Sequence, residues 1–241
     1  MKEKKTNLIN YINYKDVIII FSFWYLILFF TSMTRNISFS VPILTSIFHF
    51  LFFISGRFIF IGITVFYLSS LYPVSFSELG LVSRNKKKSF FNGLSIGLVL
   101  MLMVLFLINI PLSFSPEGYF SPLFFIKIPE DFIASLIPLI LLFFGFLIIA
   151  LGEQLLLSAI VFELFRNTLF TRLISLILSS LFYSVILLTF QPERILINLI
   201  VAFIALRLYL KNRSIISSAI FTASYYSLYI TYIFGWEYLK Y

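Results

Sequence analysis

Apolar runs long enough to cross a lipid bilayer recur along almost the whole chain. A transmembrane helix needs about 20 apolar residues, because the hydrocarbon core of a bilayer is about 30 Å thick. Only 12% of the 241 residues are charged and 61% are hydrophobic, whereas soluble domains contain about 25% charged residues. We therefore predict an all-α, polytopic membrane bundle of about seven transmembrane helices, within a range of about six to eight. The candidate runs are residues 17–33, 41–72, 90–110, 132–166, 169–190, 195–210 and 214–235.

The positive charges predict how this bundle lies in the membrane. Lysine and arginine cluster in short loops, which is typical of the cytoplasmic side of membrane proteins. With seven spans, the basic groups at residues 2–15, 84–88, 166–172 and 207–213 all fall on one side. This predicts a multi-pass protein of the plasma membrane with a cytoplasmic amino terminus. The run at 41–72 exceeds one bilayer thickness, so it is either one long tilted helix or an interfacial segment followed by a span.

The composition excludes several kinds of function. The chain has no cysteine, so it can form neither a disulfide nor a thiolate site, and its one histidine is His49. A mechanism that needs two histidines from this chain is therefore excluded. The net charge of +8 lies in the loop clusters, which we interpret as contacts with the lipid bilayer and not with nucleic acid. Since apolar runs cover most of the length, residues 1–241 are predicted to form a single integral-membrane domain.

One carboxylate, Glu153, lies inside the apolar run at 132–166. A charged side chain in the bilayer costs about 2.5–3.5 kcal/mol on insertion scales, so such residues usually mark functional sites. At 1.5 Å per residue, Glu153, Ile186 and Thr222 lie roughly 20, 21 and 12 Å in from the basic ends of their helices. Three helices would thus bring these positions to broadly similar levels, which predicts a site inside the bundle.

Four short segments of the chain carry a family resemblance. They are SELGL at 77–81 with FNGLSIG at 91–97, EQLLLSA at 153–159, SSLF at 179–182, and RSII at 213–216. In this order and spacing they resemble the CPBP family of intramembrane peptidases, which includes CAAX proteases and bacteriocin-processing enzymes. The resemblance covers about residues 78–227 and implies that family's helical core. That family has the motifs EExxxR, FxxxH and HxxxN at the last three segments.

The resemblance implies an intramembrane metalloendopeptidase, in which glutamate and histidine activate a water for attack on a peptide carbonyl. Glu153 is the catalytic residue that this chain retains. A zinc site needs about three protein ligands, so we expect no cofactor and no metal site, and zinc only if the chain is an active peptidase. The family positions in this chain are held by Gln154 (second glutamate), Ser158 (arginine), Phe182 (retained), Ile186 and Thr222 (histidines) and Tyr226 (asparagine).

Three functions stay open on this evidence. The first is a non-catalytic binding or accessory module for a membrane peptide or membrane protein, for example in peptide immunity. The second is a divergent active peptidase that uses Glu153. The third is a carrier of a small solute or lipid, although carriers usually show internal repeats and none is evident. If the role of Glu153 is structural, we expect it to hydrogen-bond Gln154, Asn198 or Thr222.

Several other residues are predicted to have structural roles. Glu163 and Arg166, at i, i+3 spacing, are predicted to form a solvated pair at the cytoplasmic edge. His49 is predicted to be packed and hydrogen-bonded. Gly93 and Gly97 allow close contact with another helix. A packing or interfacial stripe is predicted for Tyr225, Tyr226, Tyr229 and Tyr232.

Overall fold

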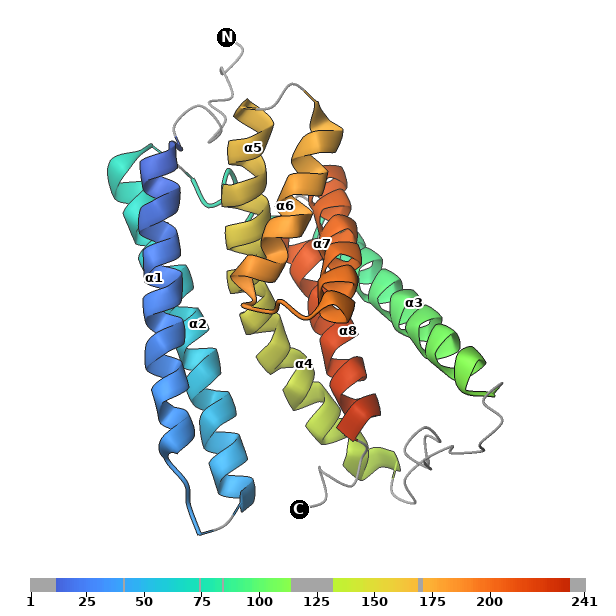
Figure 1. Ribbon diagram of the computed structural model, residues 1–241. Helices are drawn as coiled ribbons and strands as arrows, with labels where there is room; N and C mark the ends of the chain where they lie inside the picture. The colour runs from blue at the N-terminus through green and yellow to red at the C-terminus, as the bar shows by residue number, and fades with distance from the viewer. Residues whose placement is uncertain are drawn as a thin grey trace.

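The computed structural model describes residues 12–40, 42–73, 75–83, 85–113, 132–168 and 171–234, and every regular element in these segments is a helix (Figure 1). The predicted all-α class is therefore confirmed. The elements, in chain order, are α1 (Tyr14–Met33), the 3₁₀ turn η2 (Thr34–Asn36), α2 (Pro42–Leu71), α3 (Lys86–Ser113), α4 (Phe132–Gln154), the π-helical segment η4 (Leu155–Val161), α5 (Phe162–Thr168), α6 (Arg172–Ile186), α7 (Pro192–Asn212) and α8 (Ile215–Phe234).

Four helices in the described part of the chain are long and apolar enough to cross a membrane, at Tyr14–Met33, Ile47–Leu71, Leu139–Arg166 and Arg194–Asn212. The chain is thus a helical bundle of the kind that membrane proteins form. Of the two alternatives for residues 41–72, the structure has the single helix, because α2 continues through Gly56 and Arg57 for 30 residues.

Helix α6 is shorter than the apolar run at 169–190 that predicted it. Its 15 residues extend for about 22 Å, less than the bilayer core. The helix ends because the following turn leaves the helical conformation: Leu188 has φ 52°, in the left-handed region that L residues rarely adopt. The backbone N–H of Thr189 closes this turn on the carbonyl of Ser184.

The helices pack around α8 and α4. Helix α8 contacts α3, α4 and also α7, which in turn packs against α6 (Figure 1). The hairpin of α1 and α2 lies on the other side of α4 and contacts it mainly through α2. Helix α4 therefore lies between the α1–α2 hairpin and the carboxy-terminal helices.

Glycines make the contact between α3 and α8 close, as the pair Gly93 and Gly97 predicted. A Cβ at Gly93 would lie 2.6 Å from the carbonyl oxygen of Ser217, and one at Gly97 would lie 2.7 Å from the Cβ of Ser224. Real Cβ atoms do not approach other atoms so closely, so the two backbones touch only because these side chains are absent.

We expect Gly97→Ala to lower the free energy of unfolding by about 1–3 kcal/mol, because the added methyl group overlaps α8. Gly62→Ala is the matched control, since nothing lies within 4 Å of a Cβ at that position. The control should be neutral or stabilising by up to about 1 kcal/mol through helix propensity. Thermal unfolding in detergent measures both variants, and equal midpoints would show that α3 does not pack on α8 through Gly97.

Asp16 joins the first two helices at one end. Its backbone and side chain form a capping box with Asn13 at the start of α1. The same carboxylate accepts hydrogen bonds from Tyr67 Oη at 3.0 Å and Tyr72 Oη at 2.7 Å, both from the α2 end. Asp16 is buried, so these hydroxyl groups replace the water that a carboxylate would otherwise bind.

This contact predicts a pH dependence, because burial and then the hydrogen bond to Asp16 raise the pKa of Tyr72 to about 12. Since an ordinary tyrosine has a pKa of about 10, the stabilisation by Tyr72 is complete below about pH 10 and is lost towards pH 12. Thermal midpoints of the wild type and Tyr72→Phe should therefore converge over this range. The exposed Tyr14 gives the control variant Tyr14→Phe. A difference between wild type and Tyr72→Phe that persists undiminished at pH 12 would contradict the assignment.

Candidate functional site

Glu153 lies in the last turn of α4, directly before the π-helical segment η4, and is only 4% exposed. Its Oε2 accepts a hydrogen bond of 2.7 Å from the hydroxyl of Tyr183 on α6. Tyr226 of α8 interacts electrostatically with both Glu153 and Tyr183. The carboxylate therefore hydrogen-bonds to α6 and also interacts with a tyrosine of α8.

Arg57 of α2 is the cation that faces Glu153. The two side chains interact electrostatically, although they form no direct salt bridge. The guanidinium lies over the ring of Trp24, 3.7 Å from its centroid, and over the ring of Phe53 at 4.5 Å. Arg57 is 3% exposed, and its buried Nε and Nη1 have no hydrogen-bond partner. A buried cation held by two aromatic faces therefore lies next to a buried carboxylate.

Gly152 allows these groups to meet. A Cβ at this position would be 3.6 Å from Trp24, 3.7 Å from Phe60 and 3.8 Å from Arg57 Cβ. These are ordinary contact distances, so a methyl group would fit but a larger side chain would push α1 and α2 away from α4. A small residue at position 152 thus allows the Arg57 helix to lie close to Glu153.

A second polar network begins at the next residue, Gln154. Its Nε2 donates to Thr222 Oγ1 on α8 at 3.3 Å, and its Oε1 accepts from Ser158 Oγ at 3.0 Å. Thr222 in turn donates to the carbonyl of Ser218, one turn earlier on α8, at 2.9 Å. The structure therefore joins three of the altered motif positions, 154, 158 and 222, in one buried network between α4 and α8.

The remaining motif positions, 182, 186 and 226, have contacts of their own. Ile186 is fully buried, and its carbonyl accepts a 2.9 Å hydrogen bond from Trp24 Nε1. Tyr226 interacts electrostatically with Tyr183 and Glu153, as described. Phe182 is 39% exposed and packs its ring against Phe165 at 5.4 Å between centroids.

The expectation that α4, α6 and α8 meet at similar depth is confirmed by the bonds from Glu153 to Tyr183 and from Gln154 to Thr222. The expected partner of Glu153 is wrong, however. Its hydroxyl partner is Tyr183, whereas Thr222 binds Gln154. Asn198, another of the expected partners, is buried but donates to Ser184 and Thr189. Tyr183 lies about one turn before position 186 on α6, and its long side chain reaches the carboxylate of Glu153.

The groups around Glu153 do not fit the zinc site that the family resemblance implies. Zinc takes carboxylate, imidazole or thiolate ligands, about three from the protein in catalytic sites. Among the described residues, no three such side chains gather anywhere. His49 lies eight residues before Arg57 on α2, about 12 Å along the helix, and its Nε2 is 3.0 Å from the carbonyl of Ile37. It is hydrogen-bonded, as predicted, and it packs against Phe48.

Glu163 forms a separate polar centre in α5, and the prediction of a solvated pair is wrong for it. Its pairing with Arg166 exists, at 3.2 Å, but Glu163 itself is 3% exposed. The same carboxylate accepts from Tyr209 Oη at 3.1 Å and from Arg213 Nη1 at 3.4 Å. The carboxylate is buried where the end of α7 meets α5, through Tyr209 and the capping residue Arg213, which a spacing of i, i+3 within one helix could not reveal.

Sequence reasoning missed Arg57, Tyr183 and Trp24. A usable signal existed for Arg57, since it is the single charged residue within the apolar run at 41–72. The rule that singled out Glu153, that a charge inside a span is functional by default, applies equally to Arg57. Tyr183 and Trp24 carried no such signal, because aromatic residues are common throughout this chain.

Compared with protein-family models, with curated proteins and with solved structures, the chain matches none of them.

Proposed function

We propose that the chain is a divergent, non-hydrolytic relative of the CPBP intramembrane peptidases that works as a membrane-embedded binding module. The observation that carries the proposal is the environment of Glu153. Its Oε2 is bonded to Tyr183, Arg57 faces it, and it is almost wholly buried. A general base must reach the proton of a water that is held for attack. Glu153 instead completes contacts within the bundle.

The network at Gln154 supports the same proposal. An amide and two hydroxyl groups occupy positions where the peptidases need a carboxylate, an arginine and a histidine. Gln154 hydrogen-bonds to both hydroxyl groups, and its bond to Thr222 joins α4 to α8. Interhelical hydrogen bonds in membranes contribute about 0.6–1.7 kcal/mol each, which suits a structural role for the former motif.

Arg57 supports the binding part of the proposal. Buried donors without a partner are rare in native structures and cost about 1–3 kcal/mol each, more when they are charged. In Arg57, both Nε and Nη1 are buried donors without a hydrogen-bond partner. A membrane peptide or protein that offers a carboxylate or a free carbonyl would satisfy these donors once α2 moves aside from α4. Arg57 is then the recognition residue of the module.

Association of a defined peptide in liposomes tests this function. The probe is a leucine–alanine transmembrane peptide of about 20 residues with one central aspartate, and its control carries leucine there. We expect energy transfer to show preferential binding of the aspartate peptide to the wild type, weakened about tenfold or more in Arg57→Gln, because a charge-assisted hydrogen bond contributes about 1.5–3 kcal/mol.

Two comparisons make this experiment decisive. Arg207→Gln is the matched control, because Arg207 is an exposed arginine over the ring of Phe203 and should leave binding unchanged. Arg57→Lys keeps the charge and guards against misfolding of the glutamine variant. Equal binding of both peptides by the wild type would refute recognition through Arg57. Zinc-dependent cleavage of either peptide would favour the active peptidase instead.

We also propose the seven-span arrangement with a cytoplasmic amino terminus, supported by the one-sided distribution of lysine and arginine. Because the chain has no cysteine, single cysteines can report the side of each loop. Lys87→Cys in the first turn of α3 and Asn212→Cys at the end of α7 should both react with an impermeant maleimide only from the cytoplasmic side. Labelling of the two from opposite sides would contradict the arrangement.

A further inference from the structure

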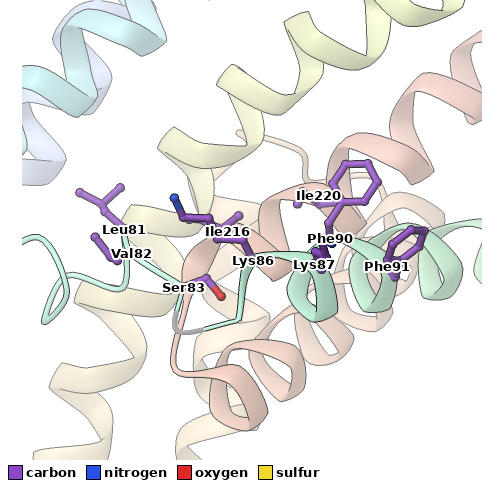
Figure 2. A pocket seen from close by; sticks show the side chains of 9 residues that line it. All are labelled: Leu81, Val82, Ser83, Lys86, Lys87, Phe90, Phe91, Ile216 and Ile220. Atoms are coloured by element: carbon purple, nitrogen blue, oxygen red, sulfur yellow. The ribbon is translucent and has the colours of Figure 1, made fainter.

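A groove of about 570 Å³ lies where the 81–83 loop meets the first turns of α3 and α8 (Figure 2). Its walls are mainly apolar and include Phe90 and Phe91 of α3 with Ile216 and Ile220 of α8. The charged residues among its lining side chains are Lys86 and Lys87. The groove therefore combines two cations with an apolar floor.

Contacts at its edges hold the groove in shape. Ser83 and Ser89 share a buried hydrogen bond of 2.6 Å, which fixes the loop to the first turn of α3. The carbonyl of Gly80 accepts from the backbone N–H of Ile215 at 2.9 Å and from Ser214 Oγ at 3.0 Å, which fixes the loop to the start of α8. The close contact at Gly93 holds α3 against α8 just beyond the groove. A ligand would thus find the groove largely formed.

No carboxylate in the described part of the chain neutralises the two lysines. Both are exposed, and neither forms an ion pair with a carboxylate in the described part of the chain. Figure 2 shows the Lys86 side chain extending across the groove in the direction of Leu81, while Lys87 lies by Phe90. Lys86 and Lys87 are the first residues of α3, and the residues that follow are mainly apolar. A basic group before an apolar run is typical of the point at which a helix enters a bilayer.

We propose that this groove binds one anionic phospholipid, with its phosphate at Lys86 and Lys87 and an acyl chain along Phe90, Phe91, Ile216 and Ile220. Basic pockets beside transmembrane helices suit anionic headgroups, because each lysine attracts the headgroup while the apolar wall contacts the chain. The charges favour an anionic lipid over a zwitterionic one, and the apolar floor favours a lipid over free phosphate. This site is separate from the Glu153 region and does not depend on the function proposed for it.

Native mass spectrometry with added phosphatidylglycerol, and with phosphatidylcholine for comparison, tests the site. We expect Lys86→Gln and Lys87→Gln each to weaken phosphatidylglycerol binding about fivefold, the effect of one lysine near an anionic headgroup. Lys88→Gln is the matched control, because Lys88 belongs to the same exposed basic run but does not line the groove. It should change binding less than about twofold.

A variant that fills the groove separates a lipid site from general attraction to positive charge. Val82 lines the groove and is 49% exposed, so Val82→Trp should fold and should block the acyl chain without changing the net charge. We expect it to weaken phosphatidylglycerol binding as strongly as Lys86→Gln does. Equal losses in all three lysine variants with no loss in Val82→Trp would overturn the proposal, as would displacement of the lipid by glycerol phosphate or a lipid-independent dimer that covers the groove.

Discussion

Replacing Arg57 by methionine is expected to lower the free energy of unfolding by about 3–5 kcal/mol, because it leaves the buried Glu153 without its cation. Methionine nearly matches the length of the arginine stem, but it also removes the guanidinium that lies over the rings of Trp24 and Phe53. Glu153→Gln alone should also be destabilising, since Arg57 then has neither a hydrogen-bond partner nor a facing carboxylate.

The double variant Arg57→Met with Glu153→Gln is the informative one. It removes both charges and keeps an oxygen that can accept from Tyr183, so it should cost less than the sum of the single changes by about 1–3 kcal/mol. Arg207→Met controls for the loss of an arginine over a phenylalanine ring at an exposed position and should cost under about 1 kcal/mol. Chemical unfolding in detergent gives all four values. Strict additivity would mean that Arg57 and Glu153 do not interact.

Replacing Glu163 by alanine is the other change with a large expected effect, a loss of about 2–4 kcal/mol. The removed carboxylate accepts from Tyr209, Arg166 and Arg213, and its loss leaves the hydroxyl of the buried Tyr209 unsatisfied. The two arginine side chains are 32% and 53% exposed, so water can replace the carboxylate for them.

The arginines therefore provide the internal comparison. Arg166→Gln and Arg213→Gln should each cost under about 1 kcal/mol, because each arginine is partly exposed and the other one still pairs with the carboxylate. Tyr209→Phe should cost about 1.5–3 kcal/mol, because a buried hydrogen bond to a charged group is lost. Unfolding measurements that rank Arg166→Gln above Tyr209→Phe would show that Glu163 acts as a surface ion pair and not as a buried centre.

The sequence allowed the class of fold to be predicted because apolar runs and helix-forming length leave few alternatives in a bilayer. The close pair Gly93–Gly97 and the meeting of α4, α6 and α8 were also predictable, since both follow from spacing along single helices. The contacts that could not be predicted are those with partners on other helices. Neither the burial of Glu163 nor its bond to Tyr209 follows from its own helix.

The candidate site, too, could be predicted only in part. The position of Glu153 in an apolar run identified it, but its partners Arg57 and Tyr183 come from segments about 96 and 30 residues away. Such pairings depend on how α2 and α6 pack against α4, which spacing along α4 does not determine. The π-helical segment η4 was equally hidden, since residues 155–161 are apolar apart from Ser158 and resemble an ordinary α-helix.

The most direct test of the central claim is the rate at which the purified protein in liposomes cleaves a membrane-embedded reporter peptide with and without zinc. The wild type should cleave no faster than empty liposomes in either condition, and Glu153→Gln should be indistinguishable from it while unfolding at a lower temperature. Zinc-dependent cleavage by the wild type that disappears in Glu153→Gln would contradict the account and would make this chain a peptidase.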